Sequence, residues 1–256
     1  MSYTMVTKTF TSTTPKTLAP EIAAWLEEQI PEVTLMYTKT SESYYNHSYV
    51  AFDGMSYGFC ISSYYDDRSI IYLAPAHSVS DSSGAKNTSV MAGDTSGITT
   101  NGVTSYSHTI AVVKTGSGYI ICSYGASLYI GYITSALIGK RFISIVMSDL
   151  SGLKCYRLDW GSAHYTTGIS YGLSHSEDAS TYNNAVCAAM VSEKDAMPSG
   201  SAILSPFYVL HESLWVEPVV IPDVYYMQAS SYPELFTPTQ IGDKEAVLVG
   251  HNIAVV

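Results

Sequence analysis

The stretch ILSPFYVLHESLWVEPVVIPDVYYMQASSYPELFTPTQIGDKEAVLVGHNIAVV, residues 203–256, decides the fold class. Its short apolar and aromatic runs are separated by single prolines or polar turns, a pattern that predicts β-strands. The runs are Phe207–Leu210, Leu214–Val216, Val219–Ile221 and Val224–Met227. Because proline cannot donate a hydrogen bond to a neighbouring strand, Pro218 and Pro222 predict strand ends or an exposed edge rather than a central strand.

The same stretch closes with a predicted hairpin. The four residues Ile241-Gly-Asp-Lys244 form a polar turn of the kind that joins two antiparallel strands. An apolar run, Ala246–Val249, follows the turn, and a second one ends at Val256. We therefore expect the end of the chain to dock into a sheet.

One amphipathic helix is predicted near the N-terminus, in the segment TLAPEIAAWLEEQIPE that begins at Thr17. Thr17 can cap the helix, and Pro20 falls in the first turn, where its missing donor is tolerated. The apolar stripe at helical spacing consists of Ile22, Trp25, Leu26 and Ile30, and Pro31 ends the helix. This stripe is either a docking surface for a partner or the face that covers a sheet of the same chain; we favour the second interpretation.

Most of the remaining chain alternates between short apolar strands and turn signals. In the first half, Asp53-Gly54 predicts a hairpin turn. The predicted strands are Val33–Tyr37, Tyr49–Phe52, Tyr57–Ile61, Ser69–Leu73, Thr109–Lys114, Gly118–Ser123, Ser127–Ile133, Arg141–Met147 and Cys155–Asp159. The fold class is therefore mainly β, with antiparallel sheets in a sandwich or barrel-like arrangement and one N-terminal amphipathic helix.

Two polar stretches interrupt this pattern. Residues 1–16 are rich in threonine and predict an extended arm, and residues 76–106 are rich in Ser, Thr, Gly and Asn and predict a long exposed loop. We expect both to become ordered against neighbouring molecules. The predicted organisation is an arm and helix over 1–32, a β-rich body over 33–202 and C-terminal strands over 203–256 that close the sheet, with a single domain as the alternative.

The composition points to a surface that makes many contacts. Only 13% of residues are charged, against about a quarter in an average protein, and the chain has 22 tyrosines but 6 phenylalanines. A tyrosine packs its ring and leaves its hydroxyl for water or a partner. Such a surface suits either a subunit that touches many neighbours in an assembly or a protein that binds sugars.

Charge and hydropathy exclude two classes of partner. The net charge is −10 and the basic residues are scattered singly, so we expect no direct binding of nucleic acid. No apolar run approaches 18 residues, so we expect no membrane span. The N-terminal residues lack the apolar core of a signal peptide, which predicts synthesis in a cytoplasm.

No pattern in the chain predicts a catalytic, cofactor or metal site. Histidines do not recur at i, i+3 or i+4, and His175-Ser-Glu177-Asp178 is typical of a solvated loop. The stretch Gly54-Met-Ser-Tyr-Gly58 matches G-x-S-x-G, but the residues after it favour a strand instead of the helix that a nucleophile elbow needs. Gly116-Ser-Gly118 is too short for a phosphate loop. The four cysteines lack a CxxC spacing and are predicted to be buried thiols.

The whole chain resembles minor virion structural proteins of tailed bacteriophages. The similarity lies in the early helix, the Ser/Thr/Gly/Tyr-rich middle, the segment Leu158-Asp-Trp-Gly-Ser162 and the closing block from Tyr225-Tyr226 through Ile241-Gly-Asp-Lys to Asn252. The resemblance implies a virion protein of the tail, neck or head–tail region, made in the host bacterial cytoplasm. It also implies assembly with copies of itself and other virion proteins, without catalysis or a cofactor.

Five aromatic residues are the candidates for assembly or binding contacts: Trp25, Trp160, Trp215, Tyr225 and Tyr226. The alternative function is a receptor- or glycan-binding β module of a phage or bacterium, in which tyrosines and the side chains of Trp160 and Trp215 stack on sugars of a host surface. A third hypothesis is a hydrolase with Ser56 as its nucleophile.

Overall fold

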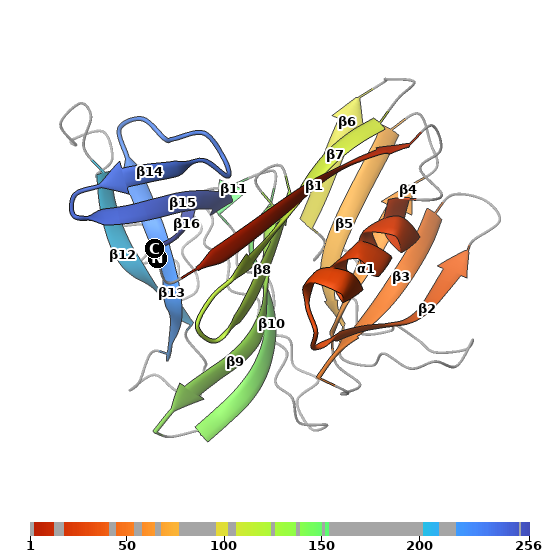
Figure 1. Ribbon diagram of the computed structural model, residues 1–256, viewed down its shortest axis with the longest axis horizontal. Coiled ribbons are helices and arrows are strands. Elements are labelled where there is room, and N and C mark those ends of the chain that lie inside the picture. The colour runs from red at the N-terminus through yellow and green to blue at the C-terminus, as the bar shows by residue number, and fades with distance from the viewer. Residues whose placement is uncertain are drawn as a thin grey trace, which may run out of the picture.

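The computed structural model describes thirteen segments of the chain: 3–12, 18–40, 45–53, 58–64, 68–76, 96–101, 106–123, 126–136, 139–149, 152–153, 202–209, 219–250 and 252–256. In these segments the chain is mainly β, with antiparallel strands in three sheets and one helix near the N-terminus, which confirms the predicted fold class (Figure 1). The strand predicted at Cys155–Asp159 lies outside the described residues.

The first sheet is a five-stranded antiparallel meander that follows the helix. Its strands lie in the order β2 (Val33–Thr40), β3 (Tyr45–Phe52), β4 (Gly58–Tyr64), β5 (Arg68–Ala76) and β6 (Ser96–Asn101). As predicted, β3 and β4 form an antiparallel hairpin and Asp53, with a φ of 53°, follows β3, but β4 begins only at Gly58 and residues 54–57 lie outside the described part of the chain.

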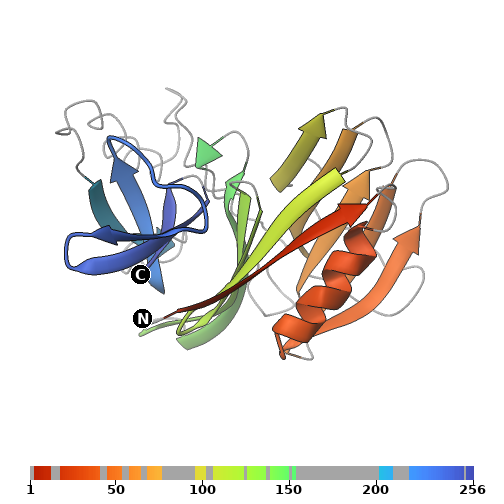
Figure 2. The same ribbon diagram turned by 45° about the horizontal axis from the view of Figure 1, so that its top comes forward.

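The second sheet is curved and lies between the other two (Figures 1 and 2). Its six strands lie in the order β1 (Thr4–Ser12), β7 (Tyr106–Lys114), β8 (Gly118–Ser123), β9 (Ala126–Ser135), β10 (Gly139–Asp149) and β11 (Gly152–Leu153). The strands β7 to β10 form the predicted meander. The predicted arm is instead an edge strand, because Thr4–Ser12 pair continuously with β7 of the same chain.

The third sheet is built from the C-terminal stretch alone. Its strands lie in the order β12 (Ala202–Val209), β13 (Val219–Ala229), β16 (Ile253–Val255), β15 (Lys244–Gly250) and β14 (Pro238–Ile241). The predicted turn at Ile241–Lys244 joins β14 to β15, with Gly242 at a φ of 61°. The chain end docks into this sheet, as predicted, because β16 lies between β13 and β15. Among the described residues, the C-terminal strands pair with one another and not with strands of the other two sheets.

The prediction for Pro222 was wrong in one respect. Pro222 lies inside β13, which has a neighbour on each side. The chain tolerates it there because the pairing of β13 with β12 skips from Val220 to Tyr225, and pairing with β16 begins only at Val224. Proline is accepted at such an irregularity because no ladder bond requires its missing N–H group.

The stretch 76–106 also differs from its prediction as one long loop. Ala76 ends β5, Tyr106 begins β7, and Ser96–Asn101 form β6, which pairs with β5. Ile98, Thr99 and Thr100 of this strand are β-branched and suit a strand. The Gly/Ser/Asn-rich surroundings hid this short signal in the sequence.

The helix α1 (Leu18–Gln29) packs its predicted stripe against the sheets of its own chain. Ile22, Leu26 and Ile30 have no exposed surface, and Trp25 is 6% exposed. They share one core with residues of β2, β3 and the central sheet, such as Val33 and Ile121. The interpretation of the stripe as a cover for a sheet is therefore confirmed.

Strands β7, β8 and β9 of the central sheet are buried on both faces. On one face, Ile110, Val112, Ile121, Leu128 and Ile130 belong to the core under α1. Residues that alternate with these point to the opposite face and are also fully buried; they are Ala111, Val113, Ile120, Cys122 and Tyr129. This second face meets the C-terminal sheet, since β15 contacts β8 and β9 and β13 contacts β9.

Candidate functional site

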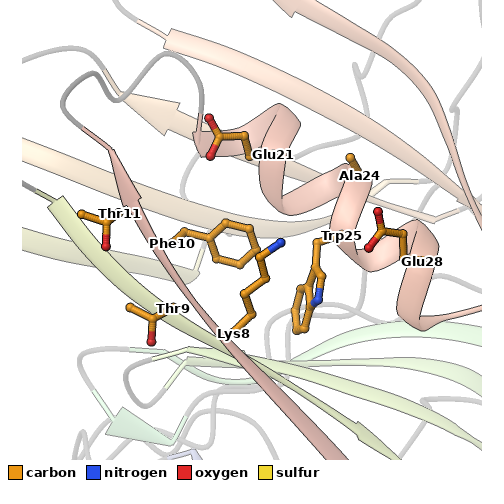
Figure 3. A pocket seen from close by; sticks show the side chains of 8 residues that line it. All are labelled: Lys8, Thr9, Phe10, Thr11, Glu21, Ala24, Trp25 and Glu28. Carbon is orange, nitrogen blue, oxygen red and sulfur yellow. The ribbon is translucent and has the colours of Figure 1, made fainter.

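A groove runs between the edge strand β1 and the helix α1 (Figure 3). Its volume is about 310 Å³. It is lined by Lys8, Thr9, Phe10 and Thr11 of β1 and by Glu21, Ala24, Trp25 and Glu28 of α1. The aromatic pair of this lining is buried, and the other six side chains are exposed. The groove therefore has an aromatic floor and polar walls.

The floor of the groove is a fixed aromatic pair. The rings of Phe10 and Trp25 meet edge to face, with centroids 5.6 Å apart. The ammonium group of Lys8 lies 4.9 Å from the centroid of Phe10, a cation–π contact. Trp25, a predicted contact residue, is thus packed mainly within its own chain, and it reaches the surface only as part of this floor.

A buried histidine lies beside the floor. His108 of β7 pairs with Phe10 in the strand register and therefore points to the same face of the sheet. The side chain has no exposed surface, and burial lowers its pKa from 6.5 to about 4. The imidazole is therefore neutral at pH 7. Its place under α1 makes it a structural group of the core.

Two tyrosine–carboxylate pairs join the first sheet to the central one. The hydroxyl of Tyr119 donates to Glu32 at 2.8 Å, and the hydroxyl of Tyr132 donates to Asp53 at 2.5 Å. Phe52 lies between the two rings, with centroid distances of 6.5 Å and 6.2 Å. Burial, reinforced by the carboxylate partner, raises the pKa of each tyrosine to about 12. The hydroxyls therefore stay protonated and hold the layers together.

The turn Thr115–Gly118 connects the central sheet to the C-terminal one. The backbone N–H of Gly116 donates to Asp223 at 3.0 Å, and the hydroxyls of Ser117 and Tyr129 share a hydrogen bond of 2.8 Å. A Cβ on Gly118 would lie 2.4 Å from the carbonyl oxygen of Ile130, so only glycine fits there. This turn is a tightly packed hairpin between β7 and β8.

The predicted contact residues Tyr225 and Tyr226 make contacts within the C-terminal sheet. The hydroxyl of Tyr225, which is half-buried, lies 3.4 Å from Nζ of Lys244, whose ammonium is 4.8 Å from the ring centroid. Tyr226 is buried, and its hydroxyl accepts a hydrogen bond from the amide of Asn252 at 3.2 Å. The same amide donates to the exposed Tyr232 at 2.7 Å.

The expectation of a tyrosine-covered surface does not hold for the tyrosines whose side chains are described. Tyr3, Tyr119, Tyr129 and Tyr226 are buried, Tyr132 and Tyr225 are half-buried, and Tyr232 is exposed. Packing decides this outcome, because a tyrosine ring can fill a core while its hydroxyl reaches a partner at the boundary. Here the hydroxyls of Tyr3, Tyr119 and Tyr132 link different layers of the chain, whereas the other hydroxyls bond within their own layer.

Several predicted residues lie outside the described part of the chain: Trp160, Trp215, Ser56, His175, Glu177 and Asp178. Cys122 is a buried free thiol, as predicted, and burial raises its pKa. The sulfur lies 3.5 Å from the carbonyl oxygen of Ala111.

The described residues contain no candidate metal site and no helix that could span a membrane. No group of three or more His, Cys, Asp or Glu residues within these segments could hold a metal ion. Likewise, α1 is too short to span a membrane, and the described segments contain no other helix.

The sequence interpretation missed the groove. A signal for it does exist on the helix, because Glu21, Ala24, Trp25 and Glu28 recur at i, i+3, i+4 and i+7 and so form a second stripe beside the apolar one. The other wall could not be foreseen, since nothing local places β1 next to the helix. Comparison of the whole chain with protein-family models, with curated proteins and with solved structures found no match.

Proposed function

We propose that this chain is a non-enzymatic structural subunit of a tailed-bacteriophage particle. In this role it assembles in the tail, neck or head–tail region with copies of itself and with other virion proteins. The resemblance of the early helix and the closing block to minor virion proteins supports this assignment. The low content of charged residues supports it as well, because charged groups are depleted at the centre of protein interfaces.

The observation that carries the proposal is an open strand edge with an exposed apolar side chain. Within the described residues, β12 is the outer strand of the C-terminal sheet, and Ile203 on it is 53% exposed. An edge strand offers unpaired N–H and C=O groups to a strand of another molecule, so proteins that remain monomeric usually protect such edges with charges. The β12 segment, AILSPFYV, contains no charged residue; its one edge-protecting residue is Pro206, and the run Ala202–Ser205 before it contains neither charge nor proline. Its edge therefore suits pairing with a neighbouring subunit.

The test is self-association of the purified full-length chain. We expect size-exclusion chromatography with light scattering to show oligomers that grow with concentration, and negative-stain microscopy to show rings or other closed assemblies. Ile203→Lys should reduce the oligomer, because it places a charge on the proposed contact.

Val220→Lys is the matched control. Val220 is 41% exposed but lies on β13, which is an interior strand of the same sheet. A compact monomer at every concentration would contradict the proposal, and so would an equal loss of association in both variants.

A second candidate function is a receptor- or glycan-binding module. The observation that favours it is the group formed by Tyr226, Tyr232 and Asn252, in which one amide holds two tyrosine hydroxyls and Tyr232 is 39% exposed. An exposed aromatic ring beside a fixed amide suits a sugar. Specific signals on a glycan array that disappear with Tyr232→Ala, while the oligomeric state stays unchanged, would favour this function.

A further inference from the structure

The groove between β1 and α1 follows the backbone edge of the strand. Four consecutive residues, Lys8 to Thr11, line it. Because successive side chains of a strand point to opposite faces of its sheet, a cavity that touches four in a row must run along the edge, where backbone N–H and C=O groups point. β1 is the outer strand of its sheet among the described strands. That edge is therefore available for a further strand.

The opposite wall is one stripe of the helix, and it matches the strand in length. Its lining residues recur at i, i+3, i+4 and i+7, which places them on a single face of α1 (Figure 3). From Glu21 to Glu28 the helix rises about 10.5 Å. From Lys8 to Thr11 the strand covers about 10 Å. Two parallel walls of equal length form a slot for an extended chain.

The charges indicate what this chain should carry. The groove lining contains two carboxylates, Glu21 and Glu28, and one cation, Lys8, whose ammonium already contacts Phe10, and the whole protein has a net charge of −10. Ala24 lies between Glu21 and Glu28 in the wall and leaves room for a long side chain. A lysine or arginine that points at the helix would lie next to these two exposed carboxylates.

We propose that this groove binds an extended segment of another protein, which adds to β1 as an antiparallel or parallel strand and places a basic side chain against α1. Strand addition to an open edge is a general mode of peptide recognition, in which backbone hydrogen bonds give affinity and side-chain contacts give specificity. A second copy of this chain would bring the same net charge of −10 to the acidic wall of the groove. The partner is therefore a different chain that carries basic residues.

This inference rests on the proposed structural role only for its choice of a protein partner. It concerns β1 and α1, whereas the self-association test concerns β12, so either can fail alone. The probe is a fluorescein-labelled peptide of nine residues, alternating threonine and valine around a central lysine. Fluorescence anisotropy with the full-length chain should show saturable binding. A peptide with glutamate at the centre should bind at least tenfold more weakly.

A third peptide tests the role of the backbone. It keeps every side chain of the lysine peptide but carries N-methyl groups on alternate amides, which removes the donors that a strand needs. We expect at least tenfold weaker binding. In hydrogen exchange, the lysine peptide should slow the amides of Lys8–Thr11.

Protein variants locate the site. Ala24→Arg should weaken binding of the lysine peptide at least tenfold, because it fills the groove and repels the lysine. Gln29→Arg adds the same side chain to the same helix outside the groove lining and should leave the affinity unchanged. Glu28→Lys is a second variant of the wall and should act like Ala24→Arg. Circular dichroism confirms that each variant folds.

Three results would overturn the proposal. One is equal affinity for the lysine and glutamate peptides, and another is binding that neither Ala24→Arg nor Glu28→Lys weakens. The third is a dimer of the chain alone that Ala24→Arg abolishes, since this would assign the groove to a second copy.

Discussion

Strands β8 and β1 belong to the same sheet but lie in opposite surroundings. In β8 every residue from Tyr119 to Ser123 is buried. In β1 the exposed residues include Thr4, Val6, Thr7, Lys8, Thr9 and Thr11, and Phe10 is its one buried residue between Thr4 and Thr11. The difference arises because β8 lies between two layers, whereas β1 lies at the rim.

This comparison shows where stability and recognition are located in this molecule. Strands with both faces covered contribute burial of apolar area, which is the main source of folding free energy. A strand at the rim contributes less burial but keeps its edge and its hydroxyl side chains available. The same sheet thus provides the centre of the fold and the wall of the groove.

The largest expected effect is a loss of core packing in β8. Ile121→Ala removes a fully buried side chain and should lower the free energy of unfolding by about 2–5 kcal/mol, measured by urea denaturation. Val6→Ala on β1 is the control, since Val6 is 42% exposed, and it should change the same quantity by less than about 0.5 kcal/mol. Similar losses in the two variants would remove the contrast between the strands.

A smaller effect concerns His108, which lies where the rim meets the core. Its folded pKa of about 4 is below the ordinary 6.5, so as the pH falls through this interval the unfolded chain takes up a proton that the folded chain excludes. Above pH 6.5 the exclusion of this proton does not reduce the free energy of unfolding. As the pH falls from 6.5 toward 4, the free energy of unfolding decreases. Between pH 7 and pH 5 the loss should be about 2 kcal/mol.

His108→Gln tests this expectation, because the carboxylates of the protein titrate in both proteins and cancel in the comparison. The variant should lose about 2 kcal/mol less than the wild type between pH 7 and pH 5 in chemical denaturation. An identical pH dependence in both proteins would show that His108 is not the group responsible.

The smallest expected effect is at the boundary between layers. Tyr119→Phe keeps the ring beside Phe52 but removes the hydrogen bond to Glu32, and it should lower the free energy of unfolding by about 1 kcal/mol. Tyr225→Phe is the matched control, because its hydroxyl meets the exposed Lys244. There we expect less than about 0.5 kcal/mol. Denaturant titration of both variants decides whether the buried hydroxyl of Tyr119 contributes more to the free energy of unfolding than the hydroxyl of Tyr225.

The sequence predicted those parts of the fold that depend on neighbouring residues. The helical stripe that includes Ile22 and Leu26 repeats every three or four residues, and the structure buries it. The turns at Asp53 and Gly242 were also visible, because both residues adopt a positive φ that Asp and Gly tolerate. Local patterns of this kind need no knowledge of the rest of the chain.

Contacts between distant segments could not be predicted in this way. The pairing of β1 with β7, the separation of the C-terminal strands into their own sheet and the groove beside Trp25 all depend on which surfaces meet in three dimensions. The same holds for the tyrosines: composition gives their number, but only packing decides that Tyr129 is buried and Tyr232 exposed. The candidate site was therefore predicted only through Trp25, whose ring forms part of the floor of the groove.

The pairing of β1 with β7 has a consequence for synthesis. Thr9 bonds to Thr109, one hundred positions later in the chain, through hydroxyls 2.9 Å apart. Ribosomes add about 5–20 residues per second, so about 5–20 s separate the synthesis of the two strands. During that interval β1 lacks β7, the strand with which it pairs. Chaperones or another exposed strand can bind to it in the meantime. The order of translation therefore leaves β1 waiting for β7, and the central sheet is complete only after β8 to β11 have also been made.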